Sequence, residues 1–128
     1  MTRDDQIALV TRYFKAVDDE DLIALLDTLC PDCVFSVETH DVRLEGHDQI
    51  TAMFTRLWHD HAAVLHHEFV HVPDPVTGGI ASRFTVQNTA QDGRLTHKSN
   101  CNFFEIRDGR FATVRVYMKG QNTLKGTA

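Results

Sequence analysis

Histidine is the side chain that most invites a chemical reading of this 128-residue chain. Seven of the eight histidines lie between His40 and His71, and imidazole can bind metals or transfer protons near neutral pH. On an extended strand, His67 and His71 would be about 13 Å apart at ~3.3 Å per residue, too far to share one ion. His59 and His61 could chelate only on an extended segment, and no cysteine or carboxylate pair converges on them. We therefore expect no metal site.

The segment Cys30-Pro31-Asp32-Cys33 has the spacing of a thiol redox motif. A reactive thiolate needs a helix N-terminus or cationic neighbours to lower its pKa. Here the motif follows a predicted helix and lies beside Asp27 and Asp32, so we interpret it as ordinary turn residues. The odd total of three cysteines fits a reducing compartment better than a disulfide scaffold.

Helical spacing of apolar residues predicts three helices within the first 60 residues. Asp4 or Asp5 can cap the first, and the acidic run from Asp18 to Asp21 is interpreted as a solvated turn whose last residue caps the second. The apolar faces comprise Ile7, Val10, Phe14 and Val17, then Leu22, Leu25, Leu26 and Leu29, then Ile50, Met53, Phe54, Leu57 and Trp58.

The rest of the chain has the pattern of strands. Short strands are predicted at 33–38 and 42–44, and from about Val64 a period near two continues between turns at 73–79, 91–93 and 107–109. Helices followed by an antiparallel meander indicate an α+β domain, residues 1–128, in which three N-terminal helices pack on a curved four-stranded antiparallel sheet. Such a cone-shaped roll has one open mouth, which is a natural small-molecule site.

Alternation along the strands predicts which side chains face the interior of the cone. Two asparagines, Asn100 and Asn102, are expected there, either as ligand contacts or as groups that satisfy each other and nearby backbone. Periodicity alone does not assign the faces of the strand that carries His67 and His71. The other residues expected inside are Ser82, Phe84, Val86, Asn88, Phe104, Ile106, Val114, Val116 and Met118.

Charge and hydropathy exclude several classes of partner. The chain has 13 Lys and Arg against 18 Asp and Glu, a net charge of −5, which argues against a nucleic-acid-binding domain. Residues 1–5 contain no apolar run of a signal peptide, and no segment approaches the ~20 apolar residues of a membrane span. We expect a soluble, cytoplasmic protein with no nucleic-acid or membrane partner.

Several segments together resemble one family. Tyr13-Phe14-Lys15-Ala16-Val17, Pro31-Asp32-Cys33-Val34-Phe35 and Gly46-His47-Asp48-Gln49-Ile50 are similar to the opening of the SnoaL-like, or nuclear-transport-factor-2-like, superfamily. The run from Phe104 to Met118 is similar to its last hairpin. The resemblance implies one domain, but its members include ketosteroid isomerases, dehydratases, epoxide hydrolases, polyketide cyclases and non-enzymes.

The resemblance also implies roles for individual residues. Tyr13 occupies the place of the isomerases' oxyanion-hole tyrosine, and Asn102 the place of an aspartic acid. The isomerases' general base falls at Val37, which cannot titrate. The family reading puts His67, Phe69 and His71 on one face, so our hypothesis is that His67 transfers a proton while Tyr13 and Asn102 stabilise an oxyanion.

The function expected from this set is proton-transfer chemistry without a cofactor, of isomerase, dehydratase or cyclase type, on a small hydrophobic and cyclic molecule. The alternative is a non-catalytic ligand-binding or interaction module of the same fold, in which Tyr13 and His67 are structural. A homodimer is expected through the outer sheet face, which carries Arg83, Gln87, His97, Arg115 and Tyr117. The remaining residues expected to bind substrate are Phe35, Val37, Phe54, Trp58, His71, Phe84, Asn100, Phe104 and Met118.

Overall fold

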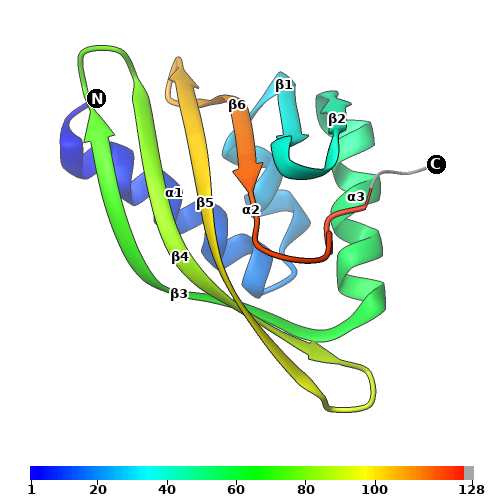
Figure 1. Cartoon of the computed structure of the whole chain (residues 1–128). Helices are drawn as coiled ribbons and strands as arrows, with labels where there is room; N and C mark the ends of the chain where they lie inside the picture. The colour runs from blue at the N-terminus through cyan, green and yellow to red at the C-terminus, as the bar shows by residue number, and fades with distance from the viewer. Residues whose placement is uncertain (126–128) are drawn as a thin grey trace.

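A computed structural model describes residues 1–125 of the chain (Figure 1). Two helices come first, a strand pair and a third helix follow, and four long strands complete the chain. The elements are α1 (Arg3–Asp18), α2 (Leu22–Asp27), β1 (Leu29–Val37), a short 3₁₀ turn (Glu38–His40), β2 (Val42–Glu45), α3 (Gly46–Asp60), β3 (His61–Asp74), β4 (Gly79–Ala90), β5 (Leu95–Arg107) and β6 (Arg110–Tyr117).

The strands form one curved sheet in the order β2-β1-β6-β5-β4-β3. The α+β class is confirmed, but the prediction of four antiparallel strands is wrong, because β1 and β2 extend the sheet to six and β1 runs parallel to β6. This pairing joins segments about 80 residues apart in sequence, and a local pattern carries no sign of it. The three helices lie within the first 60 residues, as predicted, with β1 and β2 between α2 and α3.

The helices cover the concave face of the sheet, with α1 packed on β3 and α3 on β1 and β3. Thr2, and not Asp4 or Asp5, is the N-cap residue of helix α1. The Thr2 hydroxyl accepts a hydrogen bond from the backbone N–H of Asp5, and the Asp5 carboxylate accepts one from the backbone N–H of Thr2. This capping box satisfies two otherwise unpaired donors. The start of α1 is therefore fixed by hydrogen bonds that run in both directions.

Four rings from α1, β5 and β6 form what we call the aromatic cluster: Tyr13, Phe14, Phe104 and Phe111. Phe104 and Phe111 stack at 4.4 Å between ring centroids, and Tyr13 meets both edge-on at 5.5 and 5.8 Å. All four are buried. Aromatic rings that pack this way contribute more than their buried area alone, so this cluster anchors α1 to the sheet.

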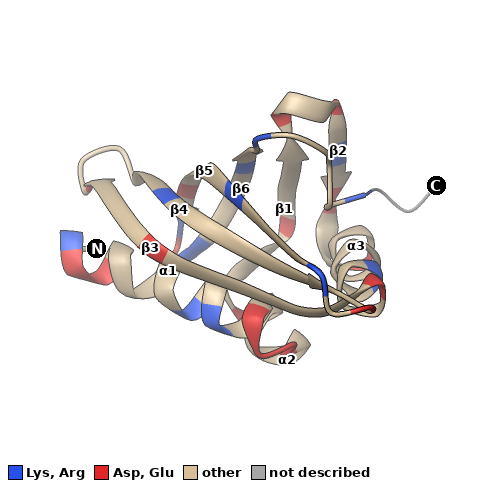
Figure 2. Cartoon of the chain, turned by 60° about the horizontal axis from the view of Figure 1, so that its bottom comes forward, with Lys and Arg blue, Asp and Glu red and all other residues tan. Residues whose placement is uncertain are grey.

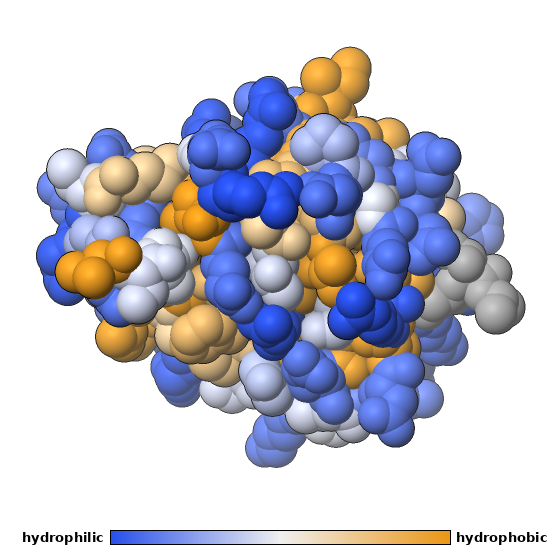
Figure 3. Space-filling view, turned by 90° about the horizontal axis from the view of Figure 1, so that it is seen from above, coloured by the Kyte–Doolittle hydropathy of each residue, from blue (hydrophilic) through white to orange (hydrophobic). Residues whose placement is uncertain are grey.

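Acidic residues gather at the turn between α1 and α2 (Figure 2). From above, apolar side chains form small groups separated by hydrophilic ones (Figure 3). Within residues 1–125, no helix is long and apolar enough to span a membrane. The same residues contain no group of three or more His, Cys, Asp or Glu placed to hold a metal ion.

Candidate active site

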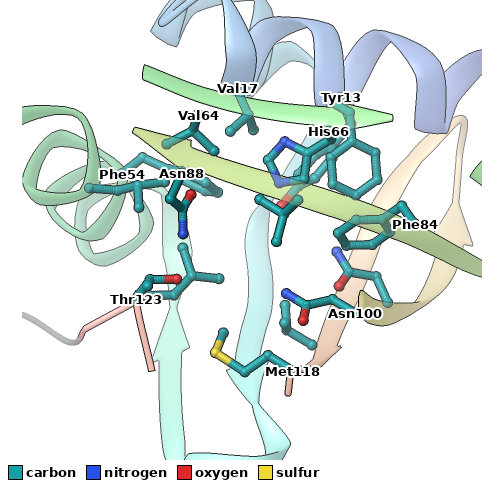
Figure 4. A pocket seen from close by; sticks show the side chains of 16 residues that line it. Tyr13, Val17, Phe54, Val64, His66, Phe84, Asn88, Asn100, Met118 and Thr123 are labelled. Carbon is teal, nitrogen blue, oxygen red and sulfur yellow. The ribbon is translucent and has the colours of Figure 1, made fainter. Parts of the chain in front are cut away.

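A small cavity lies between α1, α3 and the inner face of the sheet (Figure 4). Its volume is about 30 Å³, room for roughly two water molecules. Apolar side chains make up much of the lining, and one imidazole and three amides interrupt it. The lining residues are Tyr13, Phe14, Val17, Phe54, Leu57, Val64, His66, Phe84, Val86, Asn88, Asn100, Asn102, Val116, Met118, Thr123 and Leu124.

His66 and Asp18 form a nearly buried pair beside this cavity. The Asp18 carboxylate lies 2.5 Å from His66 Nδ1 and also accepts the His66 backbone N–H at 2.9 Å. The Asp18 side chain is only 16% exposed and the His66 side chain only 10%. Because an ionised carboxylate only accepts hydrogen bonds, Nδ1 is the nitrogen that donates to Asp18, and Nε2 is the nitrogen of His66 that Asp18 does not engage.

Aromatic rings hold the His66 imidazole in place. Its ring centroid lies 4.7 Å from that of Phe14 and 5.3 Å from that of Phe84. Among residues 1–125, no hydrogen bond engages Nε2, and the ring points into the cavity (Figure 4). A fixed imidazole with its basic nitrogen directed at a hollow is the arrangement that general-base catalysis requires.

The orientation predicted for His67 is wrong, and a bulge in β3 is the reason. His67 pairs with Thr85 and Val70 with Arg83, so three steps along β3 match two along β4. Glu68, with φ of 59°, has the left-handed backbone of this extra residue. The inward face therefore passes from His66 to Phe69 and His71. The His67 side chain lies outside the cavity lining and is 40% exposed, with Nδ1 3.6 Å from Glu68 Oε1 and with Nε2 buried without a partner among the described residues.

Tyr13 lines the cavity as expected but is also a core residue. It is 2% exposed and surrounded by rings, and its hydroxyl bonds to no other residue in the described part of the chain. Burial, and then the nearby Cys33 thiol, raise the pKa of Tyr13. The phenol therefore stays protonated and can act only as a neutral hydrogen-bond donor or acceptor.

Three asparagines from two neighbouring strands form what we call the amide wall: Asn88 on β4, and Asn100 and Asn102 on β5. They are 4%, 7% and 2% exposed. Asn100 Oδ1 accepts the Lys119 backbone N–H at 3.2 Å. Both side-chain polar atoms of Asn88 and Oδ1 of Asn102 are buried without a partner. Since buried amides demand partners, the amide wall offers hydrogen-bonding groups to any polar molecule, including water, in the cavity.

The other predicted site residues divide into two groups. Phe54, Phe84, Asn100, Asn102 and Met118 line the cavity. Phe35, Val37 and Phe104 are fully buried core, and Trp58 donates its indole N–H to the Val17 carbonyl at 2.9 Å. His71 faces inward but lies outside the cavity lining, where Nδ1 meets the Ser82 hydroxyl at 2.8 Å and burial lowers the pKa of the imidazole.

The segment that follows β6 covers part of the cavity. Thr123 and Leu124 contribute to its lining, and the Lys98 ammonium donates to the Gln121 carbonyl. The segment is also held through Lys119, whose backbone N–H reaches Asn100. A molecule larger than a few waters therefore enters only if residues 119–125 shift.

The Cys30–Cys33 segment starts β1 instead of forming a turn. Burial, followed by the neighbouring Cys30 and Asp32, raises the pKa of the Cys33 thiol to about 12. A thiol with a raised pKa is a poor nucleophile at neutral pH. The interpretation of these cysteines as structural rather than redox-active therefore agrees with their surroundings, although they form a strand.

The family model of the SnoaL-like domain matches residues 10–114. The chain belongs to the SnoaL-like family. A search among curated proteins found no significant match. Within this SnoaL-like chain, the matched residues contain the second half of α1, the whole of β1 to β5 and most of β6, and hence every cavity residue up to Asn102.

Solved structures share the fold at low sequence identity. A candidate polyketide cyclase from Xanthomonas campestris pv. campestris is 18% identical, with a TM-score of 0.84 over 91% of this chain and 92% of that one. TerC, co-crystallised with polyporic acid, is 12% identical, with a TM-score of 0.77 over 90% and 92%. An LEH-like epoxide hydrolase of M. tuberculosis is 19% identical, with a TM-score of 0.75 over 91% and 84%. At these identities the likeness establishes the fold of the SnoaL-like chain, and its chemistry has to be argued from the site.

Proposed function

We propose that this SnoaL-like chain catalyses proton transfer, without a cofactor, on a small hydrophobic molecule that contains a carbonyl group. The observation that carries the proposal is the Asp18–His66 pair, which engages Nδ1 of an imidazole that lines the cavity and leaves Nε2 without a hydrogen bond among residues 1–125. His66 thus takes the role that the sequence suggested for His67. The neighbouring structures named for polyketide cyclase and epoxide hydrolase chemistry support an enzyme of this size and fold.

In the proposed step, His66 Nε2 removes a proton from the carbon next to the carbonyl. The electrons of that C–H bond form a carbon–carbon double bond, and the carbonyl π electrons move to oxygen, which becomes an enolate. Asp18 stabilises the imidazolium that results. Where a carbon–carbon double bond is conjugated with the enolate, return of the proton from His66 to the far carbon of that conjugated system gives isomerisation. Attack of the enolate carbon on a second carbonyl breaks the π bond of that carbonyl, and the alkoxide formed takes the proton from His66, which gives cyclisation.

The amide wall supplies the groups that an enolate oxygen needs. The amide N–H groups of Asn88, which lack partners in the described structure, can donate to it, and so can the protonated Tyr13 phenol. Donors that are already fixed and desolvated stabilise developing charge with little reorganisation. No acidic residue lines the cavity, so the negative charge of an enolate meets no carboxylate there except Asp18 behind the imidazole.

A direct test is solvent-deuterium exchange at the carbon next to the carbonyl of 2-tetralone, a bicyclic ketone, followed by NMR. We expect the wild type to accelerate exchange and His66→Gln to lower the rate by about 10²- to 10⁴-fold, since glutamine can still bind Asp18 but is not a base. The matched control is His67→Gln, one residue away on the opposite face of β3. Equal loss in both variants, or exchange undiminished in His66→Gln, would rule out His66 as the base.

The alternative function, a ligand-binding module, predicts a different outcome in the same experiment. Such a module would bind 2-tetralone or its enol analogue 2-naphthol, yet no protein-dependent exchange would appear. The unpaired atoms of the amide wall are compatible with either function, because a bound ligand needs polar partners as much as a reacting one. The exchange rate therefore separates the two, whereas affinity alone does not.

We also infer that the SnoaL-like chain forms a homodimer through the outer face of the sheet. Rows of outward side chains there include exposed apolar groups: Leu65, Val70 and Val72 on β3, Phe103 on β5, and Tyr117, the last residue of β6. Exposed apolar groups on one sheet face favour association. Light scattering after size-exclusion chromatography should give twice the monomer mass, and Phe103→Glu should reduce it.

A further inference from the structure

A second hollow, a groove of about 400 Å³, adjoins the cavity on its Asn88 side. Asn88 and Thr123 line both, so the two spaces share a wall. Figure 4 shows Asn88 and Thr123 next to each other, on the side of the cavity away from Phe84. The groove is lined by His61, Asn88, Ala90, Arg94, Thr96, His97, Lys98, Lys119, Gly120, Gln121 and Thr123.

The groove is cationic although the chain as a whole is acidic. Arg94, Lys98 and Lys119 line it, and none of its lining residues is Asp or Glu, while the net charge of the chain is −5. Within residues 1–125, no carboxylate lies within ion-pair distance of any of these three cations, since every ion pair found there involves other residues. Three cations that line one groove without a counterion favour an anion there.

Lys98 is the strongest single indication of an anionic ligand. It is only 8% exposed and lies on the inner face of β5, in register with Val86. Its ammonium donates to the Gln121 carbonyl, which uses one of its three N–H groups. Burial lowers the pKa of this amine, because removal from water disfavours its charged form. An anion in the groove would compensate that charge.

The register of the sheet relates this cation to the proposed base. His66 pairs with Val86, and Val86 pairs with Lys98, so His66 and Lys98 stand in one row across β3, β4 and β5. Two strand spacings place their backbones about 10 Å apart. Asn88, with both polar side-chain atoms unpaired, lies in the next row between Val64 and Thr96. One molecule the size of two fused rings is long enough to reach from the imidazole to the ammonium once residues 119–125 shift to enlarge the 30 Å³ cavity.

We propose that the groove around Arg94, Lys98 and Lys119 binds a carboxylate on the substrate, at the end of the molecule opposite the carbon from which His66 removes a proton. This inference rests on the proposed function, because it assigns the substrate of the same site as a carbonyl compound with an acidic group. Carboxylate suits the groove better than phosphate, since only Lys98 is buried and Arg94 and Lys119 are exposed. A singly charged group therefore matches Lys98, the one buried cation. Arg94 and Lys119 are exposed, so water and salt weaken their attraction for the ligand.

The test uses stable enol analogues that differ only at the far end of the ring system: 6-hydroxy-2-naphthoate, its neutral amide, and the corresponding phosphonate. Affinities follow from naphthol fluorescence. We expect the wild type to bind the carboxylate about 10- to 100-fold more tightly than the amide. Lys98→Met, which keeps the apolar stem, should bring the ratio of the two dissociation constants close to one. Arg83→Gln removes one positive charge from the outer face of β4 and should leave the ratio unchanged.

Several results would overturn the assignment. Equal affinity of the wild type for carboxylate and amide removes the anion site, and a preference for the phosphonate over the carboxylate removes its carboxylate specificity. If Lys98→Met does not fold, the double variant Arg94→Gln/Lys119→Gln at exposed positions should still reduce the ratio several-fold. Failure of this inference is separable from failure of the proposed function, because affinity ratios report on the groove and deuterium exchange into 2-tetralone, which has no acid group, reports on His66.

Discussion

The aromatic cluster and the amide wall face the same interior and are built in opposite ways. The rings of Tyr13, Phe104 and Phe111 contact one another at 4.4 to 5.8 Å and need nothing further. The amide wall, in contrast, leaves three side-chain polar atoms of Asn88 and Asn102 unpaired. The difference teaches that large buried rings stabilise this fold, whereas the unsatisfied amides and one oriented imidazole are the groups on which the proposed ligand site rests. Aromatic side chains alone do not separate the two regions, since Tyr13 and Phe14 belong to the cluster and also line the cavity.

The largest effect should come from truncating the aromatic cluster. Phe104→Ala removes a fully buried ring that stacks on Phe111, and we expect the free energy of unfolding to fall by about 3–5 kcal/mol. Urea denaturation followed by circular dichroism measures this change. A loss below about 1 kcal/mol would show that the cluster is not what holds α1 to the sheet.

The second test concerns the carboxylate behind His66. Asp18→Asn keeps the shape of the side chain but can present its amide to Nδ1, which favours the wrong tautomer, so we expect 2-tetralone exchange to slow by about 10- to 100-fold. Asp19→Asn is the matched control, because Asp19 is exposed and pairs with Lys15 instead. A similar loss of rate in both variants would contradict a specific role for Asp18.

A smaller effect on the free energy of unfolding distinguishes two residues of the amide wall, because their substitutions should change it in opposite directions. Asn102→Leu removes a buried oxygen that has no partner, so we expect the free energy of unfolding to stay equal or to rise by about 1 kcal/mol, while affinity for 2-naphthol falls. Asn100→Leu breaks the bond to the Lys119 backbone and should destabilise the fold. Should Asn102→Leu be the more destabilising change, the amide wall would be structural.

The smallest expected effect is the contribution of His71 to the pH dependence of the free energy of unfolding. Burial lowers the pKa of His71 in the folded protein, so the folded state disfavours protonation relative to the unfolded chain. The stability that follows is fully present above the ordinary histidine pKa of about 6.5 and declines as the pH falls below it. The stability difference between wild type and His71→Gln should therefore shrink from about pH 8 to pH 5. A difference that is constant over this range would contradict the burial effect.

Strand alternation was enough to predict the amide wall. Anchoring β4 at Phe84 and β5 at Phe104 correctly places Asn88, Asn100 and Asn102 inside, since both strands run without a bulge through these positions. Helical spacing likewise places Tyr13 on the buried face of α1. Period-two and period-3.6 patterns are local properties, and they are reliable where the backbone remains regular.

The Asp18–His66 pair could not be predicted in the same way. A left-handed Glu68 shifts β3 by one residue, and glutamate gives no sequence sign of such a bulge. Asp18 begins an acidic run that is typical of a solvated turn, although its position four residues after Phe14 places both on one helix face. That spacing was the one available signal. The parallel contact between β1 and β6 is equally invisible, because the two strands are distant in the sequence.

The central claim, that His66 and not His67 presents its basic nitrogen to the ligand, is tested most directly by ¹⁵N NMR of the imidazoles during titration with 2-naphthol. We expect His66 to show one fixed tautomer, with the proton on Nδ1, and its Nε2 resonance to shift saturably as 2-naphthol binds while the His67 resonances stay unchanged. Saturable binding that moves the His67 resonances, or leaves those of His66 unmoved, would contradict the account.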